Sequence, residues 1–336
     1  MNSRLVPGVV YVFRFSPIDL DVLALAEINF DSVEKMSKLI KRKPHQLQYS
    51  IRKLKMSGIL GQLRAWIDVH SLGFNFVTVY LRFASVKPAV RREFISLVAA
   101  HPRTTWVFET SGDFHLAVSL TIKDITEVFA FFDLLEKHSK VSISAKVLCM
   151  QRDFEFFGRR YLRSARCKIP SIELPSRRNT DQKIDEIDRG LLVLLSQGGW
   201  ETERHLASRL GVPYTTVNRR LLSLRKRGIL RGYCYWLDPK HFGRQPIVLR
   251  VKVSGIAGWV KEKLWTFARQ NASVVYIIEC IGSWEFELGA DIHSASELLS
   301  LVDQVTSLID GMEVSVNPIV VTCFHKIQSF PGGLSL

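Results

Sequence analysis

The stretch LASRLGVPYTTVNRRLLSLRKRGILRGY, residues 206–233, predicts two helices followed by a strand. Its apolar residues recur at helical spacing in two groups, Leu206, Ala207 and Leu210, then Val217, Leu221 and Leu224. Gly211 supplies the permissive backbone of a tight turn, and Gly228 stands where a glycine commonly ends a helix. Residues 187–195 predict a further helix upstream, and residues 229–237 predict the strand. Three helices, with a short turn before the third, and a following strand indicate a winged helix-turn-helix.

The same pattern occurs earlier in the chain. A shift of 170 residues brings the following positions into register: Gly58-Ile59-Leu60 with Gly228-Ile229-Leu230, Trp66 with Trp236, Asp68 with Asp238, Gly73 with Gly243, and Gly112 with Gly282. This period is far too long for a solenoid repeat. The chain therefore holds two copies of one unit, at about 16–150 and 185–325.

The second half of each copy changes from helical spacing to alternation with a period of two. Residues 76–83 and 247–253 predict strands, and residues 89–100 and 259–270 predict the helices that follow them. Two strands joined at a glycine, another helix and a final strand complete the order β-α-β-β-α-β, which is that of a ferredoxin-like domain. Such a sheet leaves one apolar face open, so we expect it to pair with a second domain of the same kind.

We therefore expect an α+β chain with two tandem copies of a winged helix-turn-helix followed by a ferredoxin-like domain. The expected segments are winged helix-turn-helix 1 at 16–70, ferredoxin-like effector and oligomerisation domain 1 at 74–150, a basic linker at 151–184, winged helix-turn-helix 2 at 185–240 and ferredoxin-like effector and oligomerisation domain 2 at 244–326. The linker assignment rests on Pro170, Pro175 and an excess of basic residues, which disfavour a packed core.

Composition narrows the class of protein. The 336 residues are 47% hydrophobic and 23% charged, which is ordinary for a globular protein, and no apolar run reaches the length of a membrane span. The formal charge is +14, which favours a polyanionic partner. The 5 cysteines are widely spaced, with no Cys-x-x-Cys pair. They indicate reduced thiols in a cytoplasmic protein, and we expect no metal site and no cofactor.

The third predicted helix of each copy, with its flanks, is basic and carries no acid. Such a helix can lie in the major groove of DNA while flanking Lys and Arg neutralise phosphates, and its Asn, Gln and Arg side chains suit base edges. The candidate DNA-binding residues are Lys43, His45, Gln46, Gln48, Tyr49, Arg52, Lys53, Tyr214, Thr215, Thr216, Asn218, Arg219, Arg220, Arg225, Lys226, Arg227 and Arg231. We expect Thr215, Asn218, Arg219 and Arg220 to face the bases or the groove, and Arg225, Lys226, Arg227 and Arg231 to contact the backbone. The alternative is that these are ordinary solvated helix faces.

The chain offers little that indicates catalysis. His115, His138 and His293 have no partner carboxylate, Cys or Ser in a recognisable arrangement, and no phosphate-binding loop is present in the sequence. We therefore expect a protein that is not an enzyme.

Copy two resembles the leucine-responsive and asparagine (Lrp/AsnC) transcriptional regulators. The resemblance rests on Ile187-Asp188, on LASRLGV at 206–212, on GILRGY at 228–233 and on Leu237-Asp238-Pro239, and it extends over both copies. It implies a DNA-binding winged helix-turn-helix joined to a ferredoxin-like domain for effector binding and oligomerisation. It also places Arg220 at the family's third-helix arginine and Thr215 near the start of that helix.

The resemblance also implies that an amino acid or related metabolite binds near the turn between the second and third strands. The corresponding residues are Gly112, Asp113, Gly282 and Ser283. Copy one departs from the family pattern, because Lys41 replaces the turn glycine and Ser50 replaces the third-helix arginine. The two heads are therefore expected to read different half-sites, or one is expected to bind weakly.

We expect a cytoplasmic, nucleoid-associated regulator that binds double-stranded DNA and no membrane. Its two copies are expected to pair within the chain as a pseudo-dimer, to form a homo-oligomer, or both. One alternative is an enzyme of the same architecture that resembles the sirohaem decarboxylases, for which only His115 fits the His, Tyr and Arg cluster of that family and Glu285 stands at the equivalent place in copy two. A second alternative is a ligand-sensing module that does not bind DNA.

Overall fold

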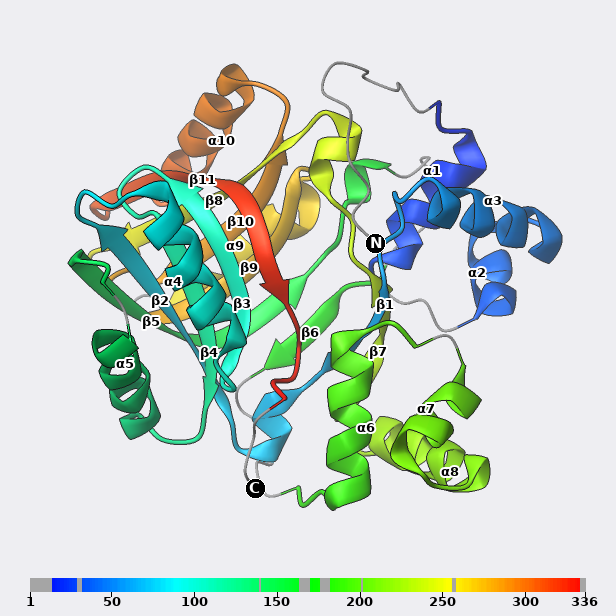
Figure 1. Cartoon of the computed structure of the whole chain (residues 1–336). Coiled ribbons are helices and arrows are strands. Elements are labelled where there is room, and N and C mark those ends of the chain that lie inside the picture. Colours follow the sequence, from blue (N-terminus) through cyan, green and yellow to red (C-terminus); the bar gives the residue numbers. More distant parts are fainter. Residues whose placement is uncertain are drawn as a thin grey trace.

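A computed structural model describes residues 14–28, 32–138, 140–162, 170–175, 182–200, 202–255 and 258–332 of the chain. Within these residues the chain runs twice through three helices and a strand, and then through the order β-α-β-β-α-β (Figure 1). The mixed α+β class predicted from the sequence is confirmed. Among the residues described, no helix is long and apolar enough to cross a membrane.

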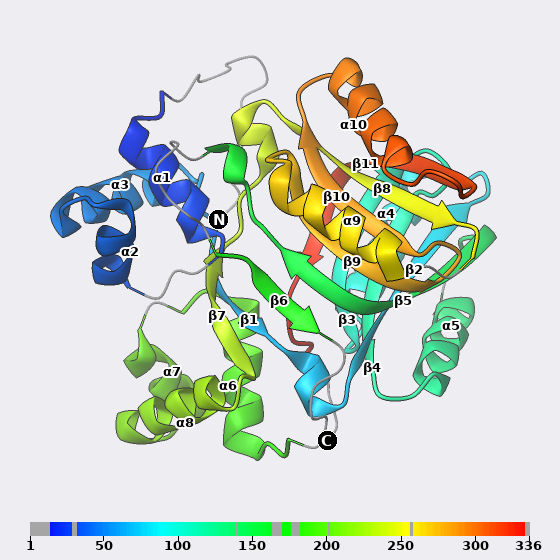
Figure 2. The ribbon, with the colours of Figure 1, turned by 180° about the vertical axis from the view of Figure 1, so that it is seen from behind.

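The two groups of three helices are called head one and head two below. Head one consists of α1 (Pro17–Ala26), α2 (Val33–Ile40) and α3 (Pro44–Met56), and head two of α6 (Glu186–Gln197), α7 (Glu203–Leu210) and α8 (Tyr214–Lys226). Side chains at the N-caps Ser16, Ser32, Asp185 and Thr202 accept backbone N–H groups and fix where four of these helices begin. Figures 1 and 2 show both heads on one side of the molecule.

The turn before the third helix has the same backbone in both heads, although its residue differs. Gly211 has a φ of 65°, and Lys41 at the equivalent place has a φ of 52°. Only glycine adopts this left-handed conformation without strain, so copy one keeps the turn at an energetic cost.

The remaining elements form the body of the molecule. Copy one contributes β2 (Asn75–Phe83), α4 (Pro88–Ala100), β3 (Thr104–Ser111), β4 (Leu116–Ile122), α5 (Thr126–His138) and β5 (Ile143–Phe156). Copy two contributes β8 (Gln245–Val253), α9 (Gly258–Gln270), β9 (Val274–Gly282), β10 (Phe286–Ile292), α10 (Ala295–Ser307) and β11 (Val314–Ile327). Helices α4, α5 and α10 lie on the side of the sheet away from the heads (Figures 1 and 2).

Eight strands close into a ring in the order β2-β4-β3-β11-β8-β10-β9-β5, because β5 also pairs with β2. The two copies meet at two seams of this ring. At one seam β11 of copy two pairs with β3 of copy one, and at the other β5 of copy one pairs with β9 of copy two. Pairing within the chain thus occurs through continuous hydrogen-bonded strands, and the open sheet edges of both copies are used up.

The heads are joined by a second exchange of strands. Strand β1 (Leu63–Ile67) of copy one pairs antiparallel with β7 (Leu230–Tyr235) of copy two. Tyr235 and Leu237 pack in the core of head one, whereas Ala65 and Ile67 pack in the core of head two. Each head therefore completes its core with residues from the other copy. Short 3-10 helices, Val69–Leu72 and Pro239–Phe242, lead from these strands into the ring.

The segment 151–184, which we expected to be a linker without core contacts, contributes to the core where the structure describes it. Strand β5 extends to Phe156 and pairs with β6 (Ile172–Pro175), while the turn Arg160–Leu162 packs against head one. Phe156, Ile172 and Leu174 are buried in one cluster. Proline and charge were misleading here, because alternate residues of this segment are apolar. Residues 163–169 and 176–181 lie outside the described part.

The chain beyond β11 returns to head two. Phe330 is fully buried in the core of that head, and its carbonyl accepts a hydrogen bond of 2.7 Å from the Ser196 hydroxyl. The last strand of each copy therefore continues into a head: β5 through Arg159 to head one, and β11 through Phe330 to head two.

Truncating Phe330 tests this attachment. Phe330→Ala removes a side chain with 0% exposure, so we expect a loss of about 3–5 kcal/mol in unfolding free energy and faster amide exchange in α6. Phe129→Ala on α5 is the matched control, because Phe129 is 59% exposed and its loss costs about 0.5 kcal/mol or less. Equal effects of the two variants in urea unfolding would contradict the described packing of Phe330.

Candidate functional site

The third helix of each head presents one exposed stripe of side chains. On α3 the stripe consists of His45, Tyr49, Arg52 and Met56, and on α8 of Thr215, Arg219, Leu222 and Lys226. Members are three or four residues apart, so they share a helix face opposite the buried stripe. Tyr49 is 71% exposed and Leu222 is 59% exposed. The two stripes hold equivalent places in the repeat, but no equivalent position carries the same residue.

The structure places the other predicted DNA-binding residues at different depths. Those exposed are Lys43, Gln48, Tyr214 and Arg225. Those half-buried are Gln46, Lys53, Thr216, Asn218, Arg220, Arg227 and Arg231. Several of the second set have partners within the protein: Asn218 donates to Glu203, and Arg231 donates to the Glu173 carbonyl.

Arg220 lies between helices of head two. Its guanidinium contacts Asp185 at 2.6 Å and Asp188 at 3.6 Å, and Arg227 also lies 3.6 Å from Asp188. Asp188 is buried, and burial together with the neighbouring Asp185 raises the pKa of its carboxyl against the lowering effect of Arg220. We expected Arg220 to face the bases or the groove. In the structure Arg220 instead links α8 to the start of α6 through Asp185 and Asp188.

In head one a buried aspartate at the equivalent place is also partnered, but by different residues. Asp19, which corresponds to Asp188, accepts the Ser50 hydroxyl at 2.7 Å and the Lys53 ammonium at 2.5 Å. Burial raises the pKa of Asp19, but the hydrogen bonds from Lys53 and Ser50 outweigh it and hold the pKa below its ordinary value. The change from Arg220 to Ser50 is therefore accompanied by a change from Ser223 to Lys53, one turn further along the helix.

The residues of the expected effector turns make contacts within the chain. Asp113 pairs with Arg250 at 3.1 Å and with Arg82 at 3.7 Å. Gly282 forms part of the seam between β9 and β5, where a side chain would meet the Leu148 carbonyl oxygen at 2.5 Å. Gly112 has open space beyond one contact with Ile319.

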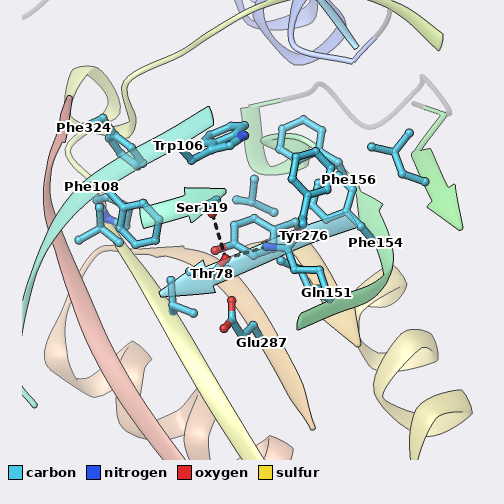
Figure 3. A pocket seen from close by; sticks show the side chains of 18 of the residues that line it. Thr78, Trp106, Phe108, Ser119, Gln151, Phe154, Phe156, Tyr276, Glu287 and Phe324 are labelled. Carbon is cyan, nitrogen blue, oxygen red and sulfur yellow. Dashed lines mark hydrogen bonds between the residues drawn. The ribbon is translucent and has the colours of Figure 1, made fainter. Parts of the chain in front are cut away.

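An internal cavity of about 120 Å³ lies between the strand ring and the heads (Figure 3). Its walls are largely aromatic, and the rings come from both copies: Trp66, Phe76, Tyr80, Trp106, Phe108, Phe154, Phe156, Trp236, Tyr276 and Phe324. The cavity therefore exists only because the two copies pair within the chain.

Two groups of polar side chains project into this cavity. Thr78 and Ser119 share a hydrogen bond of 2.9 Å, and the Gln151 amide donates to the Thr78 hydroxyl at 3.1 Å (Figure 3). Opposite them, Oε1 of buried Glu287 accepts hydrogen bonds from the Tyr80 hydroxyl at 2.9 Å and from the Trp284 indole at 2.8 Å. Burial raises the pKa of Glu287 despite these donors.

Buried charges connect the cavity to head one. Arg159 lines the cavity and pairs with Glu27 at the end of α1 and with Asp291 of β10, the latter at 2.8 Å. The Tyr161 hydroxyl donates to Asp291 at 2.6 Å. Burial raises the pKa of Glu27 to about 7, against the lowering effect of Arg159 and with a further rise from Asp291.

Sequence reasoning missed this cavity because its residues are scattered over strands of both copies. A usable signal was the pair Glu287 and Asp291 in an otherwise apolar strand, since a buried acid needs a partner. The widely spaced Cys149 and Cys280 also meet here, with their sulfur atoms and a Glu287 oxygen all within 4.8 Å of one another. The cysteine spacing alone indicated no such cluster.

Comparison with known proteins supports the resemblance found in the sequence. No protein-family model matches the chain. The regulator FL11 of Pyrococcus horikoshii, an HTH-type transcriptional regulator, is 34% identical over 85 residues, which are 25% of this chain and 55% of FL11. The HTH-type regulator LrpA of the same organism is 26% identical over 132 residues, covering 38% of this chain and 90% of LrpA. The chain thus spans about half of the first relative, and its curated relatives are helix-turn-helix regulators of the Lrp/AsnC type, which confirms the predicted resemblance.

A solved structure matches the chain over almost its whole length. The siroheme decarboxylase NirDL aligns with 94% of this chain and 94% of its own, with a TM-score of 0.60 and 14% sequence identity. At this identity the match concerns the fold alone. It shows that both copies, in this order and arrangement, form a known architecture.

Exchanging the cation positions tests the role of Arg220. We expect Arg220→Ser to leave Asp188 short of a partner and to lower the opening free energy of α6 and α8 by about 1–3 kcal/mol, measured by hydrogen exchange. Adding Ser223→Lys reproduces the arrangement of head one and should restore much of this loss. Unchanged exchange in the single variant would contradict a structural role for Arg220.

The buried Glu27 predicts a pH-dependent stability. Its folded pKa of about 7 lies above the ordinary value, so the stabilisation is complete in acid and is lost as the pH rises through 7. We expect the wild type to lose on the order of 1–3 kcal/mol more than Glu27→Gln between about pH 5 and about pH 8 in urea unfolding. Burial lowers the pKa of His70, so its contribution to stability changes with pH in the opposite direction. Both proteins contain His70, so this contribution cancels when their pH profiles are subtracted. Parallel pH profiles for the two proteins would refute the assignment.

Proposed function

We propose that the chain is a sequence-specific, double-stranded-DNA-binding transcriptional regulator of the Lrp/AsnC type. The observation that carries the proposal is the pair of exposed third-helix stripes, each with basic residues and no acid, on two heads of one chain. The curated relatives, which are HTH-type transcriptional regulators, support it. The role proposed is one of binding and not of catalysis.

In this proposal residues 16–70 and 185–240 act as winged helix-turn-helix units, and residues 74–150 and 244–326 act as ferredoxin-like domains for effector binding and assembly. Thr215 and Arg219 of head two, and His45, Tyr49 and Arg52 of head one, are exposed and would meet base edges. Lys43 and Arg225 flank these stripes, and they would contact phosphates together with Lys226 at the end of the α8 stripe. Arg220 is reassigned to support of the helix.

The two stripes have unlike chemistry, so the heads should prefer unlike half-sites. An aromatic ring and an imidazole in head one contact thymine methyl groups and acceptors, whereas Arg219 in head two suits the paired acceptors of guanine. Control by an amino-acid-like effector and self-association beyond the single chain are part of the proposal.

A sirohaem-decarboxylase-like enzyme is the second candidate, favoured by the match of fold to NirDL. Two observations weigh against it. The central cavity of about 120 Å³ is close in size to a 150 Å³ protein cavity that holds one benzene molecule, and a tetrapyrrole, which is several times larger than benzene, does not fit in that space. The histidine among the cavity's described lining residues, His70, is engaged with the Phe74 carbonyl.

Replacing Arg219 tests the proposed function. With a DNA fragment enriched from a random library, Arg219→Ala should weaken binding by about 1–3 kcal/mol and relax the preference at one position, because a bidentate contact to guanine is lost. Arg92→Ala on α4 is the matched control, since Arg92 is equally exposed but lies away from the heads. Fluorescence anisotropy measures both.

Salt dependence provides the second half of the same test. Affinity should fall steeply with salt for the wild type, because neutralised phosphates release counterions. A flat salt response, or equal affinities of the Arg219 and Arg92 variants, would contradict DNA binding through the third helix. A Soret-region spectral shift on addition of sirohaem would favour the enzyme instead.

A further inference from the structure

We infer that the central cavity binds a small organic ammonium ion, one per chain. The idea that this ion is the effector of a regulator rests on the proposed function. Binding of the ion does not depend on DNA. The site is the aromatic cavity around Glu287, which lies away from the turns at Gly112 and Gly282.

The first argument is charge balance. The carboxylates that surround the cavity are Glu287, Asp291 and, behind Arg159, Glu27. Arg159 is shared by two of these acids. Arg250 lies close enough to lower the pKa of Glu287 and is itself paired with Asp113 at 3.1 Å. Among the residues that line the cavity, the acids Glu287 and Asp291 therefore face the single arginine Arg159, and a bound cation would compensate the difference.

The second argument is the nature of the walls. The rings of Trp106, Phe108 and Tyr276 lie around the space near Glu287 (Figure 3), and Tyr80 lines the same cavity. An ammonium ion is attracted by the electron-rich faces of such rings, and the attraction is strongest in a desolvated site. A neutral apolar ligand would gain only burial from the same walls.

The third argument is the presence of polar atoms without partners. Both hydrogen bonds to Glu287 fall on Oε1, so among the described residues Oε2 accepts none. Tyr276 is half-buried beside the cavity, and its hydroxyl has no hydrogen-bond partner within the described chain. Its ring lies directly on Gly289, where a Cβ would meet it at 2.0 Å, so the glycine fixes where the ring lies. Both atoms are thus available to a ligand.

Size and symmetry define the ligand further. A cavity of about 120 Å³ accepts a molecule about as large as benzene, such as a trimethylammonium group on a short chain. The site occurs once per chain, because Ala117 and Trp106 of copy one stand where copy two has Glu287 and Tyr276. Copy one therefore lacks the carboxylate.

A pair of isosteres tests the inference most sharply. Choline and its neutral analogue 3,3-dimethylbutan-1-ol have the same shape and differ in charge. We expect choline at millimolar concentration to raise the thermal unfolding midpoint of the full chain and to bind with a stoichiometry of one in calorimetry. The neutral analogue should bind about tenfold more weakly or not at all.

Two variants locate the site. Glu287→Gln keeps an acceptor for Tyr80 and Trp284 but removes the charge, and it should weaken choline binding about tenfold or more. Glu93→Gln, on the exposed face of α4, should leave it unchanged. Trp106→Leu, which removes one aromatic wall, should also weaken choline binding and serves if the Glu287 variant fails to fold. EDTA is present throughout, so that a metal ion at Cys149 and Cys280 contributes nothing.

Three results would overturn the inference: equal affinity for both isosteres, which indicates a merely apolar cavity; no binding of choline at millimolar concentration; or choline binding that survives both Glu287→Gln and Trp106→Leu. None of these measurements contains DNA. A protein that binds choline but no DNA would therefore refute the proposed function and leave the site intact.

Discussion

The pairing of β5 with β9 and of β3 with β11 is the constraint on which the rest of the molecule depends. At the β5–β9 seam the strands approach so closely that Gly282 has no room for a side chain beside the Leu148 carbonyl. These two seams join the copies, close the ring and enclose the central cavity. The chain segments that leave β5 and β11 then carry Arg159 and Phe330 into the two heads. Their placement follows from the seams.

In a duplicated chain the two copies can carry different residues at equivalent positions, and the two copies of this chain differ at several such sites. In the heads, Arg220 and Ser223 of one copy correspond to Ser50 and Lys53 of the other, and in each head the basic residue of the pair contacts a buried aspartate. On the third-helix stripes and in the cavity, the differences between the copies are not balanced by a second exchange in this way. Glu287 has no acidic counterpart in copy one. The contact with the buried aspartate is thus present in both copies, whereas the third-helix stripes and the cavity carboxylate differ between them.

Much of this fold could be predicted from the sequence, because local patterns determine it. The repeat, the helix faces and the β-α-β-β-α-β order all follow from spacing within short windows. The exchange of β1 and β7 between the heads could not be predicted, since either strand would fit its own head equally well by pattern. The role of Arg220 was also missed, because a basic residue on a basic helix looks the same whether it faces DNA or a buried Asp188. The cavity depends on strands from both copies and has no local signal beyond the acids Glu287 and Asp291.

The central claim is that one chain presents two unlike heads on a closed pseudo-dimeric body. Selection of bound fragments from a random DNA library tests it most directly, because the symmetry of the site reports the symmetry of the protein. The account predicts an asymmetric site with two different half-sites about ten base pairs apart, or a small multiple of that spacing. A perfect palindrome selected by protein that light scattering shows to be a single chain would contradict it, because identical half-sites require identical heads.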